Sequence, residues 1–308
     1  MPILFIHGRA QQGRNSPEIS DEWLGALNKA LKKEALAEIA EKPIVPFYGD
    51  YLFKGLPVLD ADNEYEVRST DKGQFESFVD EYVREVARRA PDVAAATAAA
   101  NEDPDNFTRA PTADDYTRTP TADPDFNDRA IYNWPWVVDT IRAIDRRWPH
   151  VSAGGIARIL KDVYDYLTNK KLQAKVDDFV IEALPAASAK PLLIVAHSLG
   201  SVVLHNLLVK GRIAVPARIV TVGSPLGINA IRHRLDQVTH MPNTIKWWAN
   251  YFDKQDIVAL NAIPTAGYPG GPDILNFDGI RNPSDNHHHI TGYLDQKVVA
   301  KAIHQQLT

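Results

Sequence analysis

The stretch that decides the fold reads PLLIVAHSLG over residues 191–200. A continuous apolar run of this length is typical of a strand that is buried on both faces, as the strands of parallel sheets are. The apolar run ends just before Ser198, and apolar residues at helical spacing follow over residues 202–209. The sequence therefore predicts a serine on a tight turn between a buried strand and a helix.

Similar apolar runs occur before and after this strand along the chain. The predicted strands are residues 3–6, 44–48, 191–197, 217–222, 245–251 and 274–277. The helical patterns are residues 20–39, 74–100, 153–168, 171–184, 202–209 and 295–307. Strands that alternate with helices are the pattern of a parallel sheet with helices on its faces. We therefore expect an α/β fold with a doubly wound, mostly parallel sheet of six strands.

The middle of the chain has a different composition. Residues 101–130 are rich in Asp and Pro and contain Pro-Thr-Ala-Asp twice, so they offer little apolar surface to bury. We expect a flexible acidic loop there, inside an insertion over residues 51–150 that acts as a cap. The core would then consist of residues 1–50 and 151–308.

Composition excludes several classes of protein. The 308 residues are 44% hydrophobic and 24% charged, which is ordinary for a globular protein. The net charge of −5 argues against nucleic acid as a partner, because phosphate binding needs a basic surface. The absence of cysteine removes disulfides, thiolate nucleophiles and cysteine-ligated metals. With no long apolar run and no basic leader, we expect a cytoplasmic protein without a transmembrane segment.

The residues around Ser198 fit a nucleophile better than an ordinary turn. Ala196 and Gly200, two positions on either side, are small enough for a very tight turn that lifts the hydroxyl clear of the sheet. The backbone N–H of Leu199 would then be free to stabilise an oxyanion. The alternative is that Ser198 only caps the following helix.

This segment resembles the nucleophile elbow of the α/β-hydrolase superfamily, Gly-x-Ser-x-Gly, with Ala196 in place of the first glycine. Residues 5–9, Phe-Ile-His-Gly-Arg, are similar to the His-Gly loop that follows the first core strand in that superfamily. The resemblance implies that Ser198 is the nucleophile. It also implies that the backbone N–H groups of Leu199 and Arg9 form the oxyanion hole.

The resemblance also implies an acid and a base after later strands. Asp256 precedes an apolar pair in the frame that the superfamily uses for its acid, and Asp253 is the alternative. In the loop before the last helix, the register favours His288 as the base, with His289 as the alternative. The chain order serine, aspartate, histidine is the order of this superfamily.

Three adjacent histidines at 287–289 could suggest a metal site, but consecutive side chains on a loop diverge, so we expect no metal and no cofactor. The resemblance implies a lipase- or esterase-like serine hydrolase that cleaves a carboxylic ester, with a small ester or lipid-like substrate. The aromatic residues at 131–138 favour a lidded apolar pocket. Thioesterase, amidase or acyltransferase chemistry would use the same triad, and a non-catalytic ligand-binding protein could keep the same scaffold.

Overall fold

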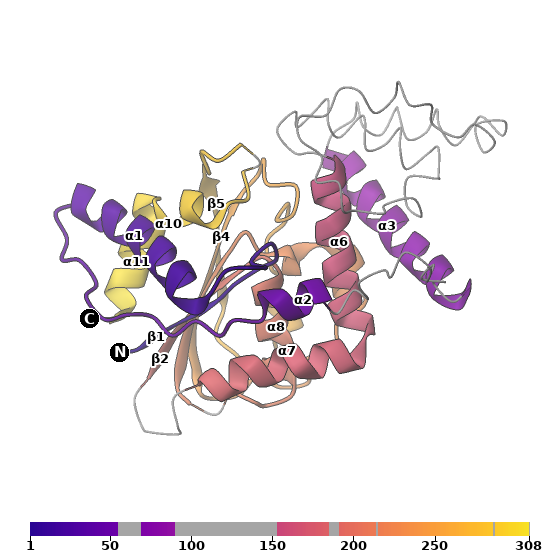
Figure 1. Ribbon diagram of the computed structural model, residues 1–308, viewed down its shortest axis with the longest axis horizontal. Helices are drawn as coiled ribbons and strands as arrows, with labels where there is room; N and C mark the ends of the chain where they lie inside the picture. The colour runs from indigo at the N-terminus through magenta and orange to yellow at the C-terminus, as the bar shows by residue number, and fades with distance from the viewer. Residues whose placement is uncertain (55–68, 90–152, 185–190, 214, 286, 308) are drawn as a thin grey trace. The chain divides into compact units, whose positions relative to one another are not determined.

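The computed structural model describes residues 1–54, 69–89, 153–184, 191–213, 215–285 and 287–307 (Figure 1). The chain divides into two compact units, Met1–Tyr82 with Ile159–Thr308 and, separately, Val83–Arg158. Of the second unit, the structure describes the end of helix α3 (Ser69–Arg89) and the start of helix α6 (Ala153–Thr168). The predicted acidic loop and the aromatic stretch at 131–138 lie outside the described residues.

The first unit contains a five-stranded sheet in which every paired strand is parallel. The strands are β1 (Ile3–Ile6), β2 (Leu192–His197), β3 (Ala217–Val222), β4 (Ile245–Asp253) and β5 (Ile274–Ile280). They lie side by side in the order β1-β2-β3-β4-β5. The predicted α/β class and parallel sheet are confirmed.

The sixth predicted strand, residues 44–48, is wrong. Only Ile44 pairs with the sheet, as a single parallel bridge to Leu4 on the side of β1 away from β2. Its N–H donates to the carbonyl of Ile3 at 2.8 Å. Pro43 and Pro46 flank this short stretch, and a proline cannot donate to a strand ladder. The prolines therefore limit the pairing to one residue.

Helices cover both faces of the sheet, as a doubly wound arrangement requires. The other helices among the described residues are α1 (Ser16–Lys33), α2 (Gly49–Lys54), α7 (Lys170–Ala183), α8 (Leu199–Val209), α9 (Asn229–Arg232), α10 (Ile290–Leu294) and α11 (Lys297–Leu307), with short 3₁₀ turns at Pro225–Gly227 and Thr265–Gly267. In Figure 1, α1, α10 and α11 lie on one side of the sheet and α7 and α8 on the other. On the first side, Trp23 and Ile303 pack in one core with Phe5, Val195 and Val222. No described helix is both long and apolar enough to cross a membrane.

Helix α1 ends earlier than its apolar pattern predicts. The pattern continues to Ile39, but the helix stops at Lys33. Ala35 has a φ of 54°, in the left-handed region, and the N–H of Leu36 donates to the carbonyl of Leu31 at 3.0 Å. This is the hydrogen-bonded turn that commonly ends a helix. Local backbone geometry therefore ends the helix before Pro43 is reached.

The last predicted helix is split. Residues 295–307 give α11, which begins at Lys297, and the additional short helix α10 precedes it. The carboxylate of Asp295, between the two helices, accepts hydrogen bonds from Lys29 and Lys33 of α1, each at 2.9 Å. The split places Tyr293 of α10 in the core.

Candidate active site

Ser198 occupies a strained turn between the end of β2 and the start of α8. Its φ is 53° and its ψ is −129°, a conformation that costs a non-glycine residue about 1–3 kcal/mol. Its side chain makes no capping hydrogen bond to α8. The capping alternative therefore does not describe this serine, and the strain indicates a position shaped for another purpose.

The turn is tight because other backbone segments pack directly against it. A Cβ atom at Gly200 would lie 2.3 Å from the carbonyl oxygen of Ile6, at the end of β1. A Cβ atom at Gly8 would lie 2.9 Å from the Cβ of Ser198. Any side chain at either glycine would force a backbone to move. The loop that follows β1 therefore runs in contact with the serine.

The structure brings Ser198, His288 and Asp256 together as one hydrogen-bonded chain. His288 Nε2 lies 2.9 Å from Ser198 Oγ, and His288 Nδ1 lies 2.8 Å from Asp256 Oδ2. The carboxylate can only accept, so Nδ1 carries the proton and Nε2 is left to accept the proton of the serine hydroxyl. This is the tautomer that a general base for serine requires.

Two further donors fix the Asp256 carboxylate. The backbone N–H of Val258 donates to Oδ1 at 2.9 Å, and the hydroxyl of Tyr293 donates to Oδ2 at 2.6 Å. Asp256 is fully buried. These donors engage both oxygens of the buried carboxylate and hold it in one orientation.

The alternative acid and base lie elsewhere. Asp253 accepts the backbone N–H of Asn282 at 2.7 Å and lies 3.3 Å from Nδ1 of His287. His289 is exposed and caps α10 by accepting the N–H of Thr291. Within the described residues, no cluster of three His, Asp or Glu side chains could bind a metal ion.

The two predicted oxyanion donors lie on the segments that meet at the serine. Leu199 is the first residue of α8, and the first N–H groups of a helix have no acceptor within it. Arg9 directly follows Gly8 in the loop that contacts Ser198. The side chain of Arg9 forms an ion pair with Asp162 of α6, which anchors this loop.

His197 contacts His288, the predicted base, in a way that the sequence did not reveal. It is buried, and burial lowers its pKa well below the usual value, so the ring is neutral at physiological pH. Its Nε2–H donates to the backbone carbonyl of His288 at 2.8 Å, and the two rings lie 4.8 Å apart. No local sequence pattern indicates this bond, and only the tertiary structure shows it.

His7 fixes the loop on the other side of the serine. Its Nδ1–H donates to the carbonyl of Gly8 at 2.7 Å, and its Nε2 accepts the N–H of Tyr48 at 3.3 Å. Its ring stacks on Tyr48 with 3.9 Å between centroids. Burial lowers the pKa of His7 to about 4, so it is a neutral structural residue at physiological pH.

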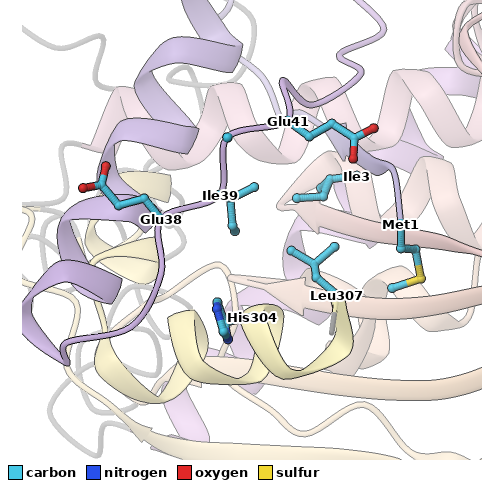
Figure 2. A pocket seen from close by; sticks show the side chains of 8 residues that line it. Met1, Ile3, Glu38, Ile39, Glu41, His304 and Leu307 are labelled. Atoms are coloured by element: carbon cyan, nitrogen blue, oxygen red, sulfur yellow. The ribbon is translucent and has the colours of Figure 1, made fainter.

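Ser198 is buried, with 1% of its surface exposed. A cavity of about 180 Å³ lies elsewhere, against Met1, Ile3, Ile39 and Leu307 (Figure 2). Because Ile3 begins β1 whereas Ser198 follows β2, this cavity is at the opposite edge of the parallel sheet.

The fold and the site together define a class of protein. It is an α/β protein in which Ser198, His288 and Asp256 form a buried series of hydrogen bonds beyond the carboxyl ends of the strands of a parallel sheet. Comparisons of the chain with protein-family models, with curated proteins and with solved structures found no match. The chemistry is therefore inferred from the residues of the site alone.

Proposed function

We propose that this protein is a serine hydrolase that cleaves a carboxylic ester through an acyl-enzyme intermediate. The observation that carries the proposal is the hydrogen-bonded chain from Ser198 through His288 to Asp256, with links of 2.9 and 2.8 Å. An α/β-hydrolase fold with residues 51–150 as its cap is part of the same proposal.

The proposed reaction begins with attack of Ser198 Oγ on the ester carbonyl carbon. As the new C–O bond forms, the hydroxyl proton passes to Nε2 of His288. Asp256 accepts the Nδ1–H of the resulting imidazolium and stabilises its charge. His288 then gives its proton to the departing alcohol. Water, deprotonated by the same nitrogen, cleaves the acyl-serine and restores the hydroxyl.

The negative charge on the tetrahedral oxygen needs donors that are in place before the reaction. The backbone N–H groups of Leu199 and Arg9 are the candidates, and each such donor contributes about 3 kcal/mol to the transition state. The packing of Gly8 against Ser198 supports this, because it brings the segment preceding Arg9 to the nucleophile.

The position of the site in the sheet also supports a ligand-binding role. After β1, the chain first pairs with one side of β1 at Ile44. It then returns to form β2 on the opposite side of β1, so the direction of the connections reverses there. Open parallel sheets bind ligands beyond the carboxyl ends of the strands at such a reversal. Gly8 and Ser198 follow the two strands that flank it.

A fluorophosphonate probe tests the proposal directly. It should label the native protein at Ser198, and the Ser198→Ala variant should not be labelled. Ser201→Ala is the matched control, because Ser201 is a buried serine three residues away whose hydroxyl contacts Ser198 O and Ser224, not His288. A folded native protein that stays unlabelled would contradict the proposal and favour a non-catalytic ligand-binding protein.

The class of bond cleaved requires a second measurement. Hydrolysis of p-nitrophenyl esters of graded acyl length reports both turnover and the depth of the acyl site. We expect esters to be cleaved faster than the matching thioesters and anilides. Preference for either of the latter would move the assignment to a thioesterase or an amidase while leaving the triad intact.

A further inference from the structure

Tyr293 binds the same carboxylate oxygen as the base. Its hydroxyl lies 2.6 Å from Asp256 Oδ2, the oxygen that also accepts Nδ1–H of His288 at 2.8 Å. Tyr293 is fully buried, and burial raises the pKa of its phenol, so it remains a neutral donor. The same hydroxyl accepts the backbone N–H of Asp253 at 3.2 Å.

The surrounding packing leaves the phenol little freedom. A Cβ atom added at Gly223 would lie 3.0 Å from Cε2 of Tyr293 and 3.3 Å from Asp256 Oδ2. Gly223 itself has a φ of 56°, a conformation that glycine adopts without strain. The absence of a side chain after β3 is therefore what lets the tyrosine ring and the carboxylate pack together.

A hydrogen bond to a carboxylate disperses its negative charge. The phenol of Tyr293 and the imidazole of His288 bind the same oxygen of Asp256. The hydrogen bond from the phenol reduces the negative charge on this oxygen, so the carboxylate stabilises the protonated form of His288 less. A donor at this place thus has two effects. It fixes the orientation of the carboxylate, and it limits how strongly Asp256 favours the imidazolium.

We infer that Tyr293 is a positioning residue that orients Asp256 and, as its larger effect on His288, weakens the stabilisation that this carboxylate gives to the protonated imidazole. Its significance for catalysis rests on the proposed function. Its effect on the imidazole exists whether or not the protein turns over a substrate, so the two claims can fail separately.

Other titratable groups surround the imidazole and must be kept constant. Four of them are histidines: His197 at the end of β2, His7 near it, and His287 and His289 in the same loop as His288. The acidic groups are Asp253 at the end of β4, which lies 3.3 Å from His287, and Glu22 of α1, which lies 3.9 Å from His289. Tyr293→Phe removes none of these charges, but it removes the acceptor of the Asp253 backbone N–H. A contribution through Asp253 would persist in an Asp256→Asn background, where the effect through Asp256 is lost.

The test is an NMR titration of ¹⁵N-histidine-labelled protein with Tyr293→Phe, using His288→Gln to assign the signals. The midpoint of the His288 titration should rise by about one pH unit when the phenol donor is lost. A tyrosine that only fills space would leave the midpoint unchanged, and one that only fixes geometry would lower it, because a loosened carboxylate stabilises the imidazolium less. Either result would overturn the inference.

Two variants sharpen the comparison. Tyr268→Phe also removes a buried phenol hydroxyl, one that lies 2.9 Å from Nδ1 of His205, and should leave the midpoint unchanged. In an Asp256→Asn background, Tyr293→Phe should produce no rise, because the carboxylate through which it acts is gone. A rise that persists there would show that Tyr293 acts by another route.

A second substitution keeps the inference testable should Tyr293→Phe fold poorly. 3-Fluorotyrosine at position 293 is a more acidic phenol and a stronger donor, so the midpoint of the His288 titration should fall; a rise would contradict the inference.

Kinetics give a second measurement. The acid limb of the kcat/KM profile of Tyr293→Phe should move to higher pH by the same amount as the NMR midpoint, with KM little changed. An unlabelled native protein would refute the proposed function, whereas a labelled protein with an unmoved titration would refute only the role of Tyr293.

Discussion

Acid should destabilise this protein well above the pH at which carboxylates are protonated, and His7 is one reason. Its ring is buried between the loop after β1 and Tyr48, with one nitrogen donating to Gly8 and the other accepting from Tyr48. Burial lowers its pKa from 6.5 to about 4. The unfolded chain therefore takes up a proton as the pH falls below 6.5, while the folded protein does not until about pH 4.

The size of the effect follows from this difference. Because the unfolded state binds more protons between these values, the free energy of unfolding falls with pH. From pH 7.5 to pH 5, His7 alone should cost about 2 kcal/mol. Burial lowers the pKa of His197 and His205 too, so their losses add in the same direction. Lys297 and Lys301 lower the pKa of Glu34, but its contribution is lost only below about pH 4.5 and lies outside this window.

Urea unfolding at pH 7.5 and pH 5 measures the change. His7→Asn is the matched variant, since its amide can still donate to Gly8 but does not titrate. The variant should be less stable at pH 7.5, and its loss between the two pH values should be about 2 kcal/mol smaller than that of the native protein. Equal losses in both proteins would refute the assignment of a buried, neutral His7.

The remaining predictions concern the residues of the site. Asp256→Asn should lower kcat by about 10⁴-fold, because the amide no longer fixes the reactive tautomer of the base; Asp253→Asn should affect stability more than turnover, and the reverse pattern would exchange the two roles. Gly200→Ala should destabilise the protein by about 3 kcal/mol or more in thermal unfolding, since the new methyl group meets backbone at 2.3 Å. Gly25→Ala, in an open position on α1, should instead stabilise it by up to about 1 kcal/mol. His197→Gln, which can still donate to the base loop, should retain more activity than His197→Leu, and equal kcat values would show that the bond is dispensable.

Most of the sheet could be predicted from the sequence because strands buried on both faces of a parallel sheet consist of short apolar runs. It failed at residues 44–48, where the side chains are apolar but Pro43 and Pro46 lack the N–H groups that pairing needs. Hydrophobicity records burial, whereas strand pairing also depends on backbone donors. The helix ends at Lys33 and Lys297 depend on local turns that apolar spacing does not encode.

The candidate site could also be predicted in part, where a local requirement restricts the residue type. The small residues around Ser198 reflect a local steric requirement, so they are visible in the sequence. The choice between Asp253 and Asp256 depends on tertiary contacts, since Asp256 meets His288 whereas Asp253 meets Asn282 and His287. The roles of His197 and Tyr293 arise from contacts with residues far along the chain, such as the bond from His197 to His288, and such contacts leave no local pattern.

The bond from His197 to the main chain of His288 also restrains the segment that carries the proposed base. Tyr293 in turn binds the carboxylate of Asp256, the proposed acid. Moving that segment away from β2 would break the hydrogen bond from His288 to Ser198. Contacts of the protein itself therefore hold Ser198, His288 and Asp256 together, so their alignment is built in before any substrate binds.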